Sequence, residues 1–286
     1  MGHLTRSQPH PHGSADAPER RLSGSARRSG LRLGFASLGS GSQGNATLVR
    51  ADGTALLIDC GFGPRELGRR LAPHGLTPED IDAIFITHEH ADHIGGAGAV
   101  ARRWGVPLWM TAGTCLAASA ALGDVPLIST LAGETTITIG ALAVHPVTVP
   151  HDAREPRQFV IEDGRSRLGV CTDLGSSTPH LSAAFAGCDG LLLEFNHDAT
   201  LLKNGDYPAF LKQRILSDWG HLSNEQAAEL LGQLAHTRLK AFVAAHLSER
   251  NNRPALVRTL AARVLGTSAD EILIAEQEAG SPWLEL

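Results

Sequence analysis

A short apolar run in this 286-residue chain is followed directly by a cluster of potential metal ligands. The run DAIFIT, residues 82–87, predicts a buried strand, and His88, His90, Asp92 and His93 lie within the next six residues. Imidazole nitrogen and carboxylate oxygen are donors that suit zinc, manganese or iron. Open α/β sheets place their ligand sites at the carboxyl ends of strands. The cluster therefore predicts a sheet that holds a metal site at its edge.

Three further residues occupy the same kind of position. His151 follows the strand-like run LAVHPVTVP, Asp173 ends the run SRLGVCTD, and His246 follows the run KAFVAA. The seven potential ligands exceed what one four-coordinate ion uses, and they suffice for two ions that share a bridging carboxylate. The sequence therefore predicts about two divalent ions per chain.

The character of the chain changes near residue 30. Residues 1–30 are rich in Ser, Pro, Gly and Arg and offer almost nothing to bury, so a disordered tail is expected there. Residues 31–286 alternate strand and helix patterns, which predicts one domain of sheets covered by helices, of the α/β (α+β) class. Helix signals include Pro64 at a first turn, and a capping box formed by Ser223 and Gln226.

Several classes of protein are disfavoured by the composition. No segment approaches the roughly 20 apolar residues of a membrane span, and no apolar leader is present, so a cytoplasmic protein without membrane contact is expected. The four cysteines are far apart and are expected to be reduced. Aromatic residues make up only 5% of the chain, which argues against an aromatic platform for single-stranded nucleic acid.

The motif HEHADH resembles the HxHxDH motif of the metallo-β-lactamase superfamily, and His151, Asp173 and His246 resemble its later metal motifs. The segments SLGSGSQGNATLV, VPHDA, CTDLG, LLLEFNHD, GHLSNEQA and AHLSERNN resemble the YycJ/WalJ-like branch, a group of 5′-to-3′ DNA exonucleases and related phosphodiesterases. The resemblance covers the chain from about Leu31 to the end. It implies an αββα sandwich, with two mixed sheets flanked by helices.

The resemblance also assigns a role to each ligand. One metal is held by three imidazoles, those of His88, His90 and His151. The second metal is held by Asp92, His93 and His246, and Asp173 bridges the two. The catalytic residues are Asp92 and His221, an active-site histidine outside the metal ligands that protonates the leaving oxygen or contacts the phosphate.

Other polar residues near these motifs are candidates for supporting the ligands or touching the substrate. They are Ser40, Ser42, Glu194, Asn196, His197, Asp198, Ser248, Arg250 and Asn251. The glycine-rich loop 37–45 lacks the lysine and the spacing of a P-loop, which argues against a nucleoside-triphosphatase.

The predicted activity is a dinuclear metal-dependent phosphodiesterase, a 5′-to-3′ DNA exonuclease that uses a metal-bridging hydroxide as its nucleophile. The net charge of −5 predicts that DNA is bound only by a local basic patch, for which Lys203, Lys212 and Arg214 are candidates. Two alternatives stay open: a small-molecule hydrolase, such as a cyclic phosphodiesterase or a thioesterase, and a non-catalytic metal-stabilised binding module. The sequence also leaves open the metal, DNA against RNA, the polarity and the oligomeric state.

Overall fold

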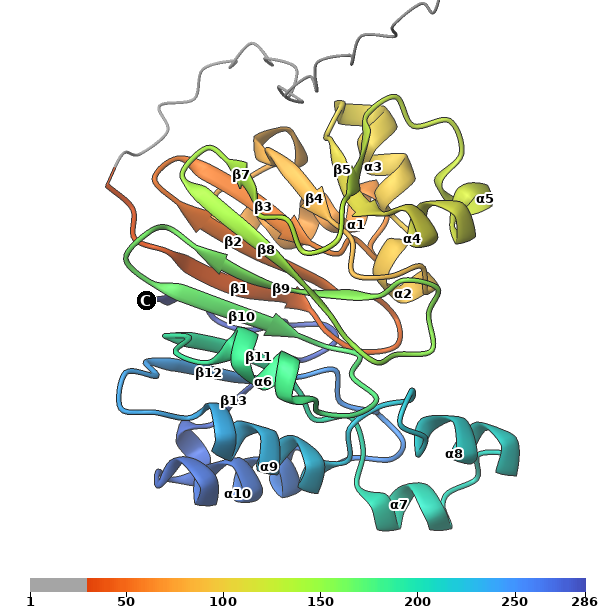
Figure 1. Cartoon of the computed structure of the whole chain (residues 1–286), viewed down its shortest axis with the longest axis vertical. Helices are drawn as coiled ribbons and strands as arrows, with labels where there is room; N and C mark the ends of the chain where they lie inside the picture. Colours follow the sequence, from red (N-terminus) through yellow and green to blue (C-terminus); the bar gives the residue numbers. More distant parts are fainter. Residues whose placement is uncertain (1–29) are drawn as a thin grey trace, which may run out of the picture.

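Two sheets packed face to face form the centre of the molecule, and helices cover the outer side of each (Figure 1). The computed structural model describes residues 30–286, so the predicted tail lies outside the described residues except for Gly30. The arrangement is an αββα sandwich, which confirms the fold expected from the sequence.

The first sheet has seven strands in the order β14-β1-β2-β3-β4-β5-β6. Its antiparallel strands are β14 (Leu284–Glu285), β1 (Gly34–Gly39), β2 (Ala46–Ala51) and β3 (Thr54–Ile58). Three strands continue the sheet in parallel from β3, namely β4 (Ala83–Phe85), β5 (Leu108–Thr111) and β6 (Ile128–Leu131). The sheet is therefore mixed, and its parallel half directs the ends of β3, β4 and β5 to one edge.

The second sheet has the same design, with the order β13-β12-β11-β10-β9-β8-β7. Its antiparallel strands are β7 (Ile137–Ile139), β8 (Leu142–Thr148), β9 (Arg157–Glu162) and β10 (Arg167–Cys171). The strands that continue in parallel are β11 (Gly190–Glu194), β12 (Ala241–Ala245) and β13 (Leu273–Ile274). The carboxyl ends of β10, β11 and β12 consequently lie side by side.

Ten α-helices lie within the described residues. Those associated with the first sheet are α1 (Pro64–Leu71), α2 (Ala91–Ile94), α3 (Ala97–Trp104), α4 (Ala112–Ala117) and α5 (Ser119–Leu122). Those that follow strands of the second sheet are α6 (Pro179–Phe185), α7 (Ala199–Asn204), α8 (Ala209–Ile215), α9 (Asn224–Leu234) and α10 (Pro254–Leu265). Short 3-10 turns are η1 (Ala72–His74), η2 (Pro78–Asp80) and η3 (Ala269–Glu271).

The apolar runs in the sequence are continuous because most central strands are buried on both faces. In β3, Leu56 and Ile58 belong to the core between the sheets, whereas Ala55 and Leu57 pack under α1 and α3. The second sheet is covered on its outer side by α6, α9 and α10. Since successive strand residues point to opposite faces, one strand contributes to two cores.

The local helix signals are confirmed. Pro64 is the first residue of α1. Gly75 ends the 3-10 turn that follows this helix, and its φ of +69° lies in the left-handed region that glycine adopts without strain. At α9, Ser223 and Gln226 form the reciprocal capping box. Helices α7 and α8 differ from the others, because they lie beside the end of the second sheet rather than over its face (Figure 1). Within residues 30–286, no helix has the length and apolar character that crossing a membrane requires.

Candidate metal centre

The loops that follow four strands bring all seven predicted ligands together. The cluster His88–His93 follows β4 and runs into α2, and the other three ligands follow β8, β10 and β12. They form overlapping groups whose ligand atoms lie within 4.8 Å of one another. Residues that are far apart in the sequence are therefore brought together in space.

Three imidazoles form the first group. His88 and His151 are buried, and His90 is partly exposed. The Nε2 atom of His88 lies 2.9 Å from Nδ1 of His90, and Nε2 of His151 lies 3.4 Å from the same nitrogen. Burial lowers the pKa of His88 well below its usual range and that of His151 to about 4, so both rings are neutral at neutral pH.

Hydrogen bonds behind these rings determine which nitrogen faces the group. The Nδ1–H of His151 donates to the carbonyl of Gly220 at 3.1 Å, because a carbonyl can only accept. The Thr87 hydroxyl donates to the Asp59 carboxylate at 3.0 Å, so it accepts from Nδ1 of His88 at 2.9 Å. Both Nε2 atoms then carry a lone pair, which is the arrangement of a metal-binding histidine.

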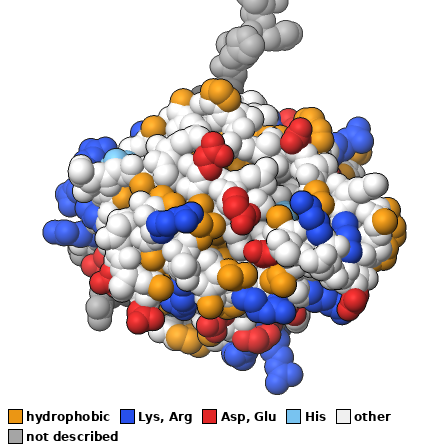
Figure 2. Space-filling view, turned by 90° about the horizontal axis from the view of Figure 1, so that it is seen from below, with side chains coloured by type: hydrophobic (Ala, Val, Ile, Leu, Met, Phe, Trp, Pro, Cys, Tyr) orange, Lys and Arg blue, Asp and Glu red, His pale blue; other side chains and the backbone are white. Residues whose placement is uncertain are grey.

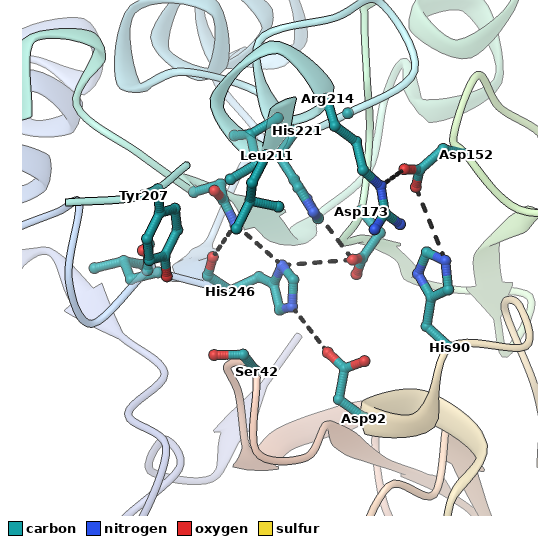
Figure 3. A pocket seen from close by; sticks show the side chains of 15 residues that line it. Ser42, His90, Asp92, Asp152, Asp173, Tyr207, Leu211, Arg214, His221 and His246 are labelled. Carbon is teal, nitrogen blue, oxygen red and sulfur yellow. Dashed lines mark hydrogen bonds and ion pairs between the residues drawn. The ribbon is translucent and has the colours of Figure 1, made fainter. Parts of the chain in front are cut away.

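Asp92, His93 and His246 form the second group. The Oδ2 atom of Asp92 lies 3.5 Å from Nε2 of His93 and 3.5 Å from Nε2 of His246. Asp173 lies between the two groups, with its Oδ2 3.1 Å from Nε2 of His93 and its Oδ1 3.9 Å from Nε2 of His151. Figure 3 shows Asp92, Asp173 and His246 around one space. The Asp173 carboxylate is placed where it could contact ions in both groups.

Two buried atoms in this space, Oδ2 of Asp173 and Nε2 of His246, have an ionisable neighbour within 3.5 Å but make no hydrogen bond of good geometry. A buried polar atom costs free energy unless a hydrogen bond, a water or an ion satisfies it. One of these atoms is a carboxylate oxygen and the other an imidazole nitrogen, and the atoms around them are of the same two kinds. The donor set therefore fits divalent metals such as zinc or manganese.

Carboxylates near the rings hold protons on two of the histidines when no metal is bound. Burial opposes a charged ring, but Asp173 and the carboxylates near it raise the pKa of His246 to about 10. For His93, burial is likewise outweighed, mainly by Asp173, and the pKa lies well above its usual range. Metal ions would replace these protons as the source of positive charge, so metal binding is expected to release protons.

The sequence analysis missed Asp59, a buried residue directly after β3. Its Oδ2 accepts from Nδ1 of His93 at 2.7 Å, and its Oδ1 accepts from the amide of Thr87 at 2.8 Å. Asp59 thereby orients Nε2 of His93 toward the second group. The run TALLID carried the same signal as the predicted ligands, an acidic residue at the end of an apolar strand.

Glu194, the last residue of β11, connects His246 with His221. Its Oε1 accepts from Nδ1 of His221 at 2.7 Å and from Nδ1 of His246 at 3.2 Å, and its Oε2 accepts from the amides of Leu174 and Leu222. Burial disfavours the charged His221 ring, but Glu194 outweighs it and raises the pKa of His221. The prediction that Glu194 supports a candidate ligand agrees with these contacts.

The His221 ring lies beside both groups and lines the cleft in front of them (Figure 3). Its centroid is 5.3 Å from that of His151 and 5.3 Å from that of His246. One of its nitrogens also lies within 4.8 Å of ligand atoms of Asp173, Glu194 and His246. Geometry therefore permits either a proton-transfer role or a ligand role for this ring.

Four other predicted residues surround the centre. The Ser40 hydroxyl accepts from the amide of His246 at 2.9 Å, and Nδ2 of Asn196 donates to the carbonyl of His246 at 3.1 Å. Ser42 and Ser248 line the cleft. The backbone N–H and C=O of His246 are therefore both held by predicted residues. Ser42 and Ser248 face the space in front of the candidate ligands.

The remaining four predicted residues form no hydrogen bond to a candidate ligand within the described part of the chain. His197 is buried with both ring nitrogens unpaired, and Asp198 accepts from two amides at the start of α7. Asn251 binds within its own loop, and the Arg250 guanidinium lies 5.9 Å from the ring centroid of Tyr207. Their contacts are with the surrounding loops.

An open cleft of about 210 Å³ leads to the ligands. The wall opposite Asp92 is formed by α8 and the turn before it, through Tyr207, Leu211 and Arg214 (Figure 3). The Nε–H of Arg214 donates to Oδ2 of Asp152, whose Oδ1 lies 3.4 Å from Nε2 of His151. The wall formed by α8 is therefore connected, through Asp152, to the group of His88, His90 and His151.

A sandwich of two mixed sheets with a histidine- and aspartate-rich cleft at its edge defines a metal-dependent hydrolase. The chain belongs to the metallo-beta-lactamase superfamily, whose family model matches residues 39–201. The family and the ligand groups together indicate a site for divalent metal.

Two curated relatives cover most of their own length. Exodeoxyribonuclease WalJ of Streptococcus pneumoniae (strain D39) is 36% identical over 245 residues, which is 82% of this chain and 91% of that protein. Exodeoxyribonuclease YycJ of Bacillus anthracis is 34% identical over 238 residues, which is 82% of this chain and 90% of that protein.

Solved structures show the same fold at low sequence identity. The metallo-beta-lactamase fold protein YhfI from Bacillus subtilis matches with a TM-score of 0.68 and 17% identity, over 88% of this chain and 99% of that one. A diphosphatase from the PhnP family matches with a TM-score of 0.65 and 21% identity, over 90% of this chain and 98% of that one. These two likenesses support the fold alone.

Proposed function

We propose that the protein is a dinuclear metal-dependent phosphodiesterase that acts as a DNA exonuclease with 5′-to-3′ polarity. The observation that carries the proposal is the pair of ligand groups on either side of Asp173, open to a cleft. Support for the substrate comes from two relatives that bear the name exodeoxyribonuclease and match over about nine tenths of their length. The polarity rests on the resemblance to the YycJ/WalJ-like branch, and the cytoplasmic location is part of the same proposal.

Each ligand has a role in this proposal. One ion would be held by His88, His90 and His151, and the other by Asp92, His93 and His246, and the Asp173 carboxylate would serve both. Bound zinc or manganese, or alternatively iron, would lower the pKa of a water and neutralise charge on the phosphate. Asp59 and Glu194 keep the rings in the tautomers that present Nε2, so the protein itself fixes the direction of the donors.

His221 is the residue that we assign to proton transfer. Its Nδ1 is occupied by Glu194 at 2.7 Å, which leaves Nε2 as its second proton site. The ring lines the cleft and its side chain is 20% exposed, so a leaving oxygen in the cleft can approach it. A leaving alkoxide needs a proton, and a positioned histidine is the residue that most often supplies one.

A small-molecule hydrolase is the second candidate. The cleft of about 210 Å³ is below the range of about 300–1,000 Å³ that is usual for small-ligand pockets, so a compact phosphodiester would fill it. On the face seen from below, Lys and Arg side chains are scattered among acidic and hydrophobic ones rather than gathered in one field (Figure 2). Substrate comparison is therefore the decisive measurement.

The test is a nuclease assay on DNA duplexes labelled at the 5′ or the 3′ end, with zinc or manganese supplied. The proposal expects mononucleotide release from the 5′ label first, complete loss after chelation, and recovery when metal is returned. Asp173→Ala serves as the inactive control, because it removes the carboxylate between the groups. Release from the 3′ label first would refute the polarity. Hydrolysis of a small diester without any attack on DNA would refute the exonuclease and favour the second candidate.

A further inference from the structure

The cleft wall opposite the ligands is made by one continuous segment, residues 207–219, which we call the α8 arm. Tyr207, Leu211 and Arg214 of this segment line the cleft. In Figure 1 its helix lies apart from the helices that cover the sheets, beside the end of the second sheet. The arm therefore contributes little to the hydrophobic cores, so packing does not explain which side chains it carries.

Exposed aromatic rings are concentrated on the α8 arm. Of the eight Phe residues in the chain, seven are buried and only Phe210 is exposed, at 72%. Trp219, at the other end of the arm, is 59% exposed, and Tyr207 is the only tyrosine of the chain. Phe210 and Trp219 are each next in sequence to a residue that lines the cleft, Leu211 and Gly220. The low aromatic content predicted no stacking platform, yet the two most exposed rings belong to the segment that forms a wall of the cleft.

The charge of the arm is opposite to that of the chain. Helix α8 carries Lys212 and Arg214, and the rest of the arm adds only Asp218, so the arm has a net charge of +1 in a protein of net charge −5. Arg214 uses Nε for Asp152, and the four N–H groups on its two Nη atoms have no hydrogen-bond partner among the described residues. A guanidinium with a free planar pair of donors fits phosphate oxygens.

The arm is also fixed relative to the metal ligands. Its cation Arg214 is paired with Asp152, the residue after His151. Beyond its carboxyl end, the carbonyl of Gly220 accepts from Nδ1 of His151 at 3.1 Å. A Cβ added at Gly175 would lie 2.2 Å from the carbonyl oxygen of residue 218, so the arm packs closely against the loop that follows Asp173. A strand bound on the arm would thus be held at a defined distance from the centre.

We propose that the α8 arm binds unpaired nucleotides of a nucleic-acid strand beside the phosphate that is hydrolysed, with Arg214 on a phosphate and Phe210 and Trp219 stacked on bases. The inference rests on the proposed nuclease function and names its preferred substrate, a strand with a single-stranded end. Because the cleft is small, nucleotides next to the scissile phosphate extend beyond it, and Phe210 and Trp219 are exposed on the segment that forms one of its walls. Stacking on aromatic side chains is tolerant of sequence, as an exonuclease requires.

The test compares the double variant Phe210→Ala/Trp219→Ala with wild type, on a fluorescent single-stranded oligonucleotide and on bis(4-nitrophenyl) phosphate. The full-length protein is used with manganese present. Removing two stacking contacts is expected to raise the KM for the oligonucleotide by about 30-fold or more. The change in kcat/KM on the small diester is expected to be at least tenfold smaller than that on the oligonucleotide, since the diester is too short to reach the rings.

Two further variants sharpen the test. Arg214→Gln should raise the KM for the oligonucleotide and reduce the slope of log KM against log salt by about 0.7, the value for one contact to a single-stranded phosphate. Leu116→Ala is the matched control, because Leu116 is 64% exposed on α4, and it should retain wild-type values on both substrates. Unchanged thermal unfolding of the double variant would show that the fold is retained.

The outcomes separate this inference from the proposed function. An oligonucleotide KM within twofold of wild type in the double variant would overturn the arm as a binding surface, while the nuclease proposal would stand. Equal losses on both substrates would also overturn it, because the variant would then act through the metal centre. A wild-type protein that hydrolyses the diester but no oligonucleotide would refute the nuclease function, and the arm proposal with it.

Discussion

Replacing His221 by alanine separates proton transfer from metal binding. The ring is held by one carboxylate, Glu194, whose Oε1 keeps its bond from His246 at 3.2 Å and whose Oε2 keeps two amide donors. The buried carboxylate thus keeps three donors, and the loss of one charge-assisted hydrogen bond should cost about 1.5–3 kcal/mol of folding free energy. Removal of a general acid should instead raise the activation barrier by about 3–5 kcal/mol, which is roughly 10²–10⁴-fold in turnover.

The assay measures kcat on a DNA oligonucleotide and on an aryl phosphodiester, together with metal content by elemental analysis. The loss should shrink on the aryl substrate, because a phenolate leaves without needing a proton. His180→Ala is a matched control, since His180 is 54% exposed and pairs with Glu134 on the surface. By contrast, His246→Ala should lose metal and fail on both substrates.

Two results would refute this reasoning. If His221→Ala empties a metal position, the ring is a ligand, in the group that it forms with Asp173, Glu194 and His246. If the variant keeps its metals but is equally slow on alkyl and aryl leaving groups, His221 binds the substrate rather than protonating it.

The other predictions address the metals, the ligand support, the thiols and the tail. Asp173→Ala should lose metal occupancy and nearly all activity by elemental analysis and nuclease assay, and full metal content would refute its central role. Asp59→Asn should weaken metal binding by about 10–100-fold in a metal titration, because it changes the partner of His93; unchanged affinity would show that the hydrogen bond is dispensable. Burial raises the pKa of Cys60 to about 12, and two other cysteines are also buried, so a thiol reagent should titrate only Cys115 in the native protein and four thiols in denaturant. Deleting residues 1–30 should shift the thermal midpoint by no more than about 2 °C, since they offer little to bury, and a larger drop would place them in the core.

Most of the candidate ligands were predictable from the sequence because they follow runs that are apolar on both faces; His151, after the alternating strand β8, is the exception. Strands of a sheet that is covered on both sides are apolar along their length, so a polar residue directly after such a strand is conspicuous in the sequence. Asp173 and His246 are two such residues. Asp59 has the same signal and was missed only because it lies outside the histidine motifs. Its role depends on a contact with His93 across two loops, at 2.7 Å, which no local pattern contains.

The α8 arm was not predictable in the same way. The segment AFLKQRI has the pattern of an ordinary amphipathic helix, in which Phe210 would be expected to face a core. Close packing of the arm against the loop at Gly175 accompanies an orientation in which Leu211 and Arg214 line the cleft and Phe210 is exposed. Exposure of that ring follows from tertiary contacts, which periodicity alone does not determine.

The backbone at the centre shows why its donors converge. Asp59, Asp173 and His246 have φ angles of 63°, 56° and 55°, in the left-handed region that residues other than glycine rarely adopt. Each such residue costs on the order of 1–3 kcal/mol, and glycine would remove most of that cost. At Asp173 and His246 the turn directs the side chain from the end of its strand toward the space between the ligand groups, and at Asp59 it directs the carboxylate to Nδ1 of His93. Glycine has no side chain to direct. Surrounding contacts hold these turns in place, such as the 2.8 Å bond from the Asp59 amide to Phe85 and the 2.9 Å bond from the His246 amide to Ser40. The sheets and these backbone contacts therefore fix the direction of the donors, and a pre-arranged donor set reduces the free energy that metal binding would spend on ordering them.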